Sequence, residues 1–121
     1  MKPEFKAGRN IAMKVPAHEY RKTVIFYRDI LGLPQVGGVV GDTEESIRFE
    51  FGDKVLWIDS VCGLSQAEVW LELITDDIEQ ASAWLARNHC VRRDEIEPLP
   101  DGFRGFWVSS PANIIHLVTV P

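Results

Sequence analysis

The order of hydrophobic patterns along this chain occurs twice, and this repeat limits the possible folds more than any other feature. Residues 10 to 15 alternate polar and apolar side chains, as a half-buried strand does. The segment from His18 to Leu31 then places apolar residues at helical spacing, and Gly32 follows where a helix commonly ends. The apolar positions of this predicted helix are Tyr20, Val24, Tyr27 and Leu31. The chain therefore begins with a strand and an amphipathic helix.

Three further strands are predicted after this helix. They lie near Gln35 to Val40, Ser46 to Phe51 and Lys54 to Asp59, and a tight Gly52-Asp53 turn joins the last two.

The same order then returns in the second half. Glu68 to Thr75 alternates, and Asp76 or Asp77 can cap a helix that carries apolar residues at helical spacing. The elements that follow are the helix positions Ile78, Ala81 and Leu85, and strands at about Val91 to Glu97, Phe103 to Ser109 and Asn113 to Val120.

Strand, helix and three strands, found twice, predict an α+β fold of two βαβββ modules. Module one covers about 9–59 and module two about 67–120, with a linker from Ser60 to Gln66. A chain of 121 residues with 45% apolar side chains suits one domain over residues 1–121. We expect each helix to cover the back of its own sheet, so that the other sheet faces define a shared concavity.

The composition of the chain limits the classes of partner that it can bind. The formal charge of −5 and the absence of a basic stripe argue against nucleic acid. No apolar run approaches the ~18 residues of a membrane span, and the first residues lack the apolar stretch of a secretory signal. We therefore expect a cytoplasmic protein, with Cys62 and Cys90 reduced and with no membrane partner.

Two motifs resemble the glyoxalase/bleomycin resistance/extradiol dioxygenase superfamily, also called the vicinal oxygen chelate superfamily. Residues 26–33, Phe-Tyr-Arg-Asp-Ile-Leu-Gly-Leu, are similar to its FY-x-x-x-LG-[LF] helix end. Residues 110–117, Ser-Pro-Ala-Asn-Ile-Ile-His-Leu, resemble its DP-[DE]-G-N-x-[IL]-E-[LF] closing strand, one residue short and with His116 in place of the glutamate. The resemblance implies a glyoxalase-like cleft between curved mixed sheets, a small-molecule ligand and a homodimer.

The resemblance also implies metal ligands on the first and last strands of each module, and most of these positions hold other residues here. Asn10, Trp57 and Trp70 occupy the first three, which leaves His116 as the one good match for a metal ligand. Indole does not bind metal, so we expect no cofactor, with a divalent metal as the alternative. Because either Asp76 or Asp77 can start the second helix, the alignment of the strand from Glu68 to Thr75 with the family stays open by a residue or two. In this strand Glu68 and Glu72 lie on the same face as Trp70.

Alternation along the strands assigns a polar, tryptophan-rich set to the cleft and an apolar set to the helix side. The cleft set is Asn10, Lys14, Arg48, Glu50, Trp57, Asp59, Glu68, Trp70, Glu72, Trp107, Ser109 and His116. The helix-side set is Ile11, Met13, Ile47, Phe49, Leu56, Ile58, Val69, Leu71, Leu73, Ile115 and Leu117.

Aromatic walls with a few polar groups are typical of a binding pocket, and we expect six ligand-binding residues. They are Asn10, Lys14, Arg48, Trp57, Trp70 and Trp107. Two alternatives stay open. The tryptophans can instead fill the space between sheets or bury a dimer interface, and Arg48 and Lys14 can instead pair with Glu50, Glu68 or Glu72.

Three functions compete. The first is a metal-free protein that binds a small aromatic or heterocyclic molecule, which the tryptophans favour. The second is a metal-dependent lyase, isomerase or dioxygenase of the superfamily. The third is acid/base catalysis without metal, with His116 and Glu72 as the catalytic pair. The turn-rich segment 98–105 is either a lid over the site or a plain connector.

Overall fold

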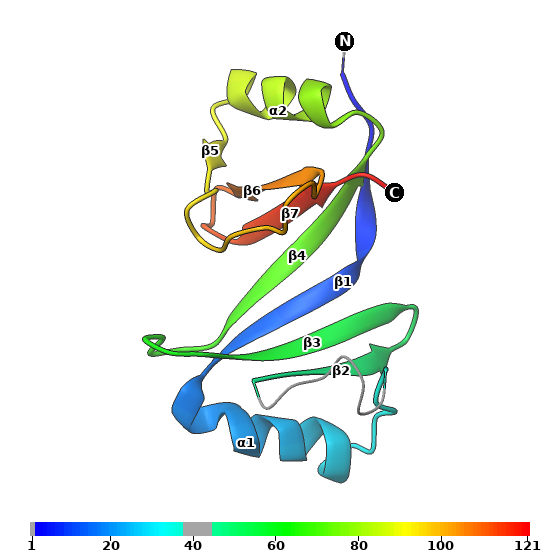
Figure 1. The fold of residues 1–121 in the computed structure, drawn as a ribbon, viewed down its shortest axis with the longest axis vertical. Helices are drawn as coiled ribbons and strands as arrows, with labels where there is room; N and C mark the ends of the chain where they lie inside the picture. Colours follow the sequence, from blue (N-terminus) through cyan, green and yellow to red (C-terminus); the bar gives the residue numbers. More distant parts are fainter. Residues whose placement is uncertain (1, 38–44) are drawn as a thin grey trace. The chain divides into compact units, whose positions relative to one another are not determined.

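The computed structural model describes residues 2–37 and 45–121, and within them a strand, a helix and two strands are followed by a strand, a helix and three strands (Figure 1). Two compact units are present. The first unit is Arg9–Val69, and the second is Trp70–Pro121 together with the N-terminal residues through Gly8. The first carries the predicted helix of module one and the second that of module two. The expectation of one domain over residues 1–121 stays a prediction.

In the first unit, three strands form a mixed sheet that α1 covers on one side. Strand β1 (Phe5–Pro16) runs parallel to β3 (Lys54–Val61), and β3 pairs antiparallel with β2 (Ser46–Phe51). Helix α1 (Ala17–Ile25) contributes Val24 to a core made of apolar strand residues. These strand residues are Val15, Ile47, Phe49, Leu56 and Ile58, with Ile11 and Met13 packed beside them. The apolar parity predicted for these three strands is confirmed.

The helix of the first unit ends in a wider turn than the sequence predicted. A π-helical turn, η1 (Phe26–Ile30), follows α1, and the Leu31 N–H donates to the Phe26 carbonyl at 2.9 Å, five residues back. This extra residue per turn rotates the end of the helix. Leu31 is therefore 51% exposed, and Leu33 packs against the core instead. Gly32 has the left-handed φ of +70° that a helix C-terminus favours.

The strand predicted near Gln35 to Val40 is reduced to a single bridge within the described residues. Gln35 pairs with Phe49, and the Val36 N–H donates to the Arg48 carbonyl at 2.9 Å. The rest of that predicted strand lies outside the described residues. The turn predicted at Gly52-Asp53 is confirmed, with Gly52 at φ +65°.

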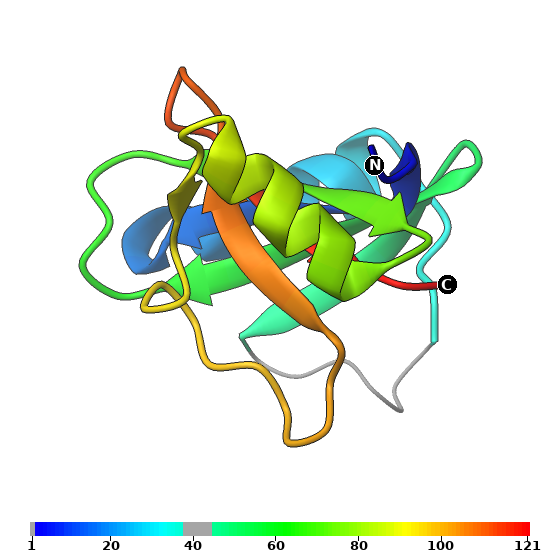
Figure 2. The ribbon, with the colours of Figure 1, turned by 90° about the horizontal axis from the view of Figure 1, so that it is seen from above.

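The second unit has four strands and a helix. Strand β4 (Glu68–Thr75) enters it at Trp70 and runs parallel to β7 (Ile115–Thr119); β7 pairs antiparallel with β6 (Gly105–Ser109), and β6 with β5 (Val91–Arg92). Helix α2 (Ile78–Arg87) lies across β6 (Figure 2) and buries Ala81 against a core of Phe106, Val108 and Val118. Of the two predicted caps, Asp77 accepts from the Gln80 N–H at 3.0 Å.

The N-terminal segment completes this second unit. The Thr75 hydroxyl donates to the Glu4 carbonyl at 2.9 Å, and the Glu4 N–H donates to Asp76 Oδ1 at 3.0 Å. Phe5 packs against the core of the unit. Asp77 thus caps α2, while Asp76 accepts a hydrogen bond from the N-terminal segment at Glu4.

Two strands of the second unit are shorter than predicted. The strand expected from Val91 to Glu97 ends at Arg92, because Arg93 turns its N–H to the Trp107 carbonyl and Asp94 accepts from the Trp107 N–H at 3.3 Å. The strand expected from Phe103 begins at Gly105, because the Phe103 N–H closes a turn on Pro100. Both cysteines are free, as expected. Across residues 2–37 and 45–121, the helices lack the length and apolar character of a membrane span.

Candidate functional site

The first unit has a polar side on its sheet, opposite α1, which we call the polar face. Strand pairing arranges its side chains in three rows across β1, β3 and β2. The rows are Lys14, Asp59 and Ser46; Ala12, Trp57 and Arg48; and Asn10, Val55 and Glu50. Directly paired residues share a face, so the predicted cleft residues of these strands lie together. Alternation alone was sufficient to find them, because these strands carry no bulge.

A charged cluster occupies the first row. The Lys14 ammonium contacts Asp59 Oδ2 at 2.8 Å, and the Ser46 hydroxyl donates to Asp59 Oδ1 at 2.6 Å. The two charged side chains are only 6% and 18% exposed. Asp59 thus forms an ion pair with Lys14, for which Glu50, Glu68 or Glu72 had been considered as partners. The row holds a charge pair in fixed geometry at the edge of the polar face.

An aromatic cluster occupies the other end of the polar face. The Trp57 indole N–H donates to Asn10 Oδ1 at 2.9 Å, and the Arg48 guanidinium lies 5.2 Å from the Trp57 ring centroid. Both Trp57 and Arg48 are half-buried. This stacking fixes the guanidinium plane over an aromatic surface and leaves part of both groups open to solvent. An aromatic wall beside a cation is thereby built from adjacent strands.

The tryptophans of the second unit are packed inside it. Trp70 and Trp107 are 8% and 6% exposed, and their rings meet edge to face with centroids 5.2 Å apart. The Trp107 indole N–H donates to the Glu97 carbonyl at 2.9 Å. These two rings are buried, and their expected role in ligand binding stays a prediction. Trp57 remains the half-exposed tryptophan of the predicted ligand-binding set.

His116 lies on the other face of its sheet from Glu72, so the face predicted for His116 is wrong. It pairs with Leu71 on one side and Val108 on the other, whereas Glu72 pairs with Leu117. Val108 belongs to the core under α2. The His116 ring nitrogen Nδ1 lies 3.0 Å from the Ile114 carbonyl. Ile115 and Leu117, predicted on the helix side, instead share a face with Trp107 and Glu72.

The closing motif explains the shift. Asn113 has φ +63°, the left-handed conformation in which the motif places glycine, and asparagine tolerates it better than most residues. With Asn113 at the glycine position, residues 110–118 can be aligned with the motif without a deletion, and Pro111 is then the residue identical to it. Leu117 then takes the position of the metal-binding glutamate, and His116 that of the apolar residue before it. The register of β7 could have been found from the sequence by allowing asparagine to take the place of the motif's glycine.

This register predicts different effects of two substitutions at one position. Asn113→Gly and Asn113→Ala both remove the carboxamide that accepts from Arg93 at 3.0 Å. Alanine keeps the Cβ at positive φ whereas glycine removes it, so Asn113→Ala should be about 1–2 kcal/mol less stable than Asn113→Gly. Urea unfolding of the two variants measures the difference. Equal stabilities would contradict the glycine-like role of Asn113.

The segment 98–105 connects β5 to β6 by way of turns, as expected. Just before it, the Glu97 carbonyl holds the Trp107 indole, and Thr119 donates to the Arg104 carbonyl at 2.8 Å. Both ends are thus tied to the sheet of the second unit. These contacts favour the connector over the lid.

Neither unit offers metal ligands at the strand positions that the family resemblance implies. In the first unit these positions hold Asn10 and Trp57, which bind each other, and in the second Trp70 and Leu117. Indole and alkyl groups do not ligate metal ions. Nor do the residues that the structure describes gather three or more His, Cys, Asp or Glu side chains at one point. The residues at these positions do not fit a divalent metal.

Comparison with known proteins identifies the fold. No protein-family model matches the chain, and no curated protein matches it in sequence. Among solved structures, the Mn(II)-bound glyoxalase from Novosphingobium aromaticivorans is 18% identical with a TM-score of 0.67, over 98% of this chain and 40% of its own. Homoprotocatechuate 2,3-dioxygenase from Arthrobacter globiformis is 20% identical with a TM-score of 0.65, over 98% and 37%.

The Brevibacterium fuscum homoprotocatechuate 2,3-dioxygenase in complex with 3,4-dihydroxyphenylacetate matches at 19% identity and a TM-score of 0.64, over 98% and 37%. This chain thus spans about two fifths of the length of these proteins or less. The similarities confirm the α+β fold that the motifs predicted, that of the glyoxalases and extradiol dioxygenases.

Proposed function

We propose that this chain, which has the glyoxalase and extradiol dioxygenase fold, binds a small aromatic or heterocyclic molecule without the metal of that fold's enzymes. The observation that carries the proposal is the hydrogen bond between Asn10 and Trp57. Both residues occupy positions where the superfamily places metal ligands. The amide oxygen and the indole satisfy each other there, and the pair presents an aromatic surface in place of a ligand set.

The chemistry of the polar face indicates what kind of ligand suits it. Trp57 offers a partly open ring for stacking, and Arg48 beside it offers guanidinium N–H groups. Guanidinium donors favour carboxylate or carbonyl oxygens in the plane of the fork. An aromatic ring that carries such an oxygen would meet both groups. Lys14 was also expected to bind ligand, and it lies in the neighbouring row of the polar face as an ion pair with Asp59.

The two catalytic alternatives have less support. A metal-dependent lyase, isomerase or dioxygenase is the activity class of the structural neighbours, and it needs donors that Trp57 and Leu117 do not supply. Acid/base catalysis by His116 and Glu72 needs both groups within reach of one substrate atom. Their places on opposite faces of β7 and β4 argue against such a pair. Binding without chemistry is the function that the polar face supports best.

Metal content and ligand binding test the proposal together. We expect protein purified without a histidine tag to hold no stoichiometric metal, and its tryptophan fluorescence to stay constant as zinc, nickel, manganese or iron(II) is added. We expect 3,4-dihydroxyphenylacetate, benzoate or nicotinate to quench Trp57 saturably in the presence of a chelator. Metal retained at about one ion per chain would contradict the proposal and favour the metal-dependent enzyme.

Matched arginine variants locate the binding. Arg48→Gln should weaken the ligand about tenfold, since it removes charge-assisted hydrogen bonds and the stack on Trp57. Arg21→Gln is the control, because Arg21 is exposed on α1, away from the polar face. If both variants weaken the ligand equally, or if none of the three probes quenches saturably, the polar face is not the site.

A further inference from the structure

A hollow lies in the second unit, and its lining residues include none of the tryptophans. It measures about 550 Å³ and opens between the end of α2 and the turn that joins β6 to β7. Its wall includes residues 88–91 after the helix and the β6–β7 turn at 109–113. Such a volume suits a small molecule rather than a single water.

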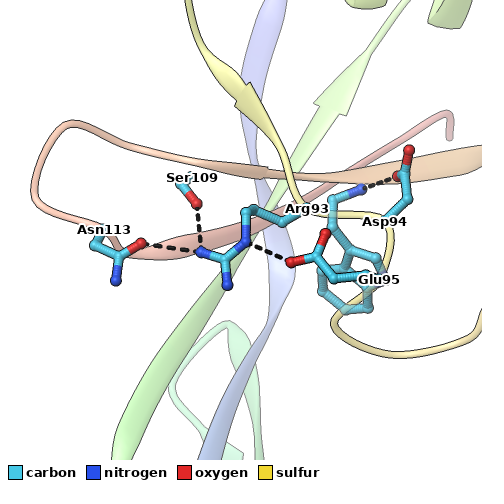
Figure 3. Close-up of polar contacts among 6 residues, drawn as sticks. Arg93, Asp94, Glu95, Ser109 and Asn113 are labelled. Atoms are coloured by element: carbon cyan, nitrogen blue, oxygen red, sulfur yellow. Dashed lines mark hydrogen bonds and ion pairs between the residues drawn. The ribbon is translucent and has the colours of Figure 1, made fainter.

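Arg93 forms the fixed part of this wall (Figure 3). Its Nη1 donates to Ser109 Oγ and to Asn113 Oδ1, both at 3.0 Å, and its Nε donates to Glu95 Oε2 at 2.8 Å. Among the described residues, Nη2 has no acceptor. The guanidinium is thus held in one orientation by three bonds while two N–H groups remain for a ligand.

The wall of the hollow combines apolar side chains with polar groups that can donate hydrogen bonds. Besides Arg93, its wall carries the His89 imidazole, the Ser110 hydroxyl and two carboxamides, and none of the described residues that line it is acidic. His89 is exposed and stands at φ +63° just after α2, which projects its ring from the helix end. Donor groups in a wall without a carboxylate favour an anion.

Glu95 is the acidic residue that accepts a hydrogen bond from Arg93, and it lies outside the wall of the hollow. Its hydrogen bond from Arg93 holds the pKa of the Glu95 carboxyl below its ordinary value, so it is ionised at neutral pH. The carboxylate is 67% exposed, and exposed pairs of this kind contribute little. Glu95 therefore orients the guanidinium and competes with an incoming anion for its charge to a modest degree.

We propose that this hollow binds a small molecule through its oxyanion, a phosphate or a carboxylate, which accepts from Arg93 Nη2 and from Ser110 or His89. The site is independent of the polar face, since its residues lie after α2 and at the β6–β7 turn. It gives the chain a second ligand of anionic character. The inference does not rest on the aromatic ligand proposed above.

The test is a titration of the ¹⁵N-labelled chain with inorganic phosphate and, separately, with acetate, at constant ionic strength set with chloride. We expect amide and Arg93 Nε–H signals of residues 88–93 and 109–113 to shift and saturate with one of the two. The tighter probe identifies the oxyanion class. Shifts that do not saturate, or that scatter over surface lysines and arginines, would show an adventitious ion only and overturn the site.

Three variants make the test specific. Arg93→Gln should weaken the tighter probe about tenfold or more, because it removes the charged donor. Arg92→Gln removes the same charge one residue earlier, where the side chain pairs with Asp94 and stacks on Phe106 outside the wall, and should leave binding within about twofold.

Glu95→Gln tests the site even if Arg93→Gln fails to fold. Glu95 is exposed, so this substitution leaves the core intact and removes the competing charge on Nε. Binding should tighten about two- to fivefold. Equal affinities for Glu95→Gln and the unchanged chain, or equal losses in Arg92→Gln and Arg93→Gln, would overturn the proposal.

Discussion

Phe49→Ala should lower the free energy of unfolding by about 3–5 kcal/mol, a large part of the roughly 5–15 kcal/mol that a domain has. Phe49 is fully buried in the core between the first sheet and α1. Its ring lies 6.4 Å from that of Tyr27, which arrives from the π-helical turn. Removing it leaves a cavity that neighbours from three elements must line.

Phe51→Ala is the matched control on the same strand. Phe51 is two residues further along β2 and 45% exposed, so its loss should cost less than about 1 kcal/mol. Urea unfolding of both variants, followed by circular dichroism, gives the two values, and an unchanged slope keeps them comparable. Similar losses of unfolding free energy for the two variants would mean that Phe49 is not a central residue of the core.

The sequence was enough to predict both helices and most strands, because their period is set by which side must be buried. Ser46–Phe51 and Glu68–Thr75 have the predicted ends. The π-helical turn at Phe26–Ile30 was not foreseeable from spacing, since one extra residue per turn leaves the apolar pattern almost unchanged. Leu31 was consequently assigned to the core and is exposed.

Part of the candidate site could likewise be predicted from the sequence, and part of it could not. Alternation predicted the polar face, where no bulge interrupts β1, β2 or β3. It failed on β7, because Ile114 and Ile115 are both apolar and do not mark a face. The register there depended on the backbone at Asn113, whose positive φ a sequence pattern does not reveal. Nor did alternation show that Trp107 would be buried under the Glu97 carbonyl.

Lys14→Met should destabilise the chain by about 3 kcal/mol, because it strands a largely buried carboxylate. Asp59 would keep its 2.6 Å hydrogen bond from Ser46 and lose the ammonium at 2.8 Å. Methionine fills much of the volume of the lysine stem, so the loss reports charge rather than a cavity. Lys22→Met on exposed α1 is the control, with a change below about 0.5 kcal/mol.

The double variant Lys14→Met/Asp59→Asn separates the charge from the contact. The amide still accepts from Ser46 and carries no charge, so the double variant should recover about 2 kcal/mol of the loss. Urea unfolding of both single variants and the double closes a mutant cycle and gives the coupling energy of the pair. Additive losses would show that Lys14 and Asp59 act separately. A strong coupling with near-normal stability of the double variant would mean that the two charges stabilise each other and add little net stability to the fold.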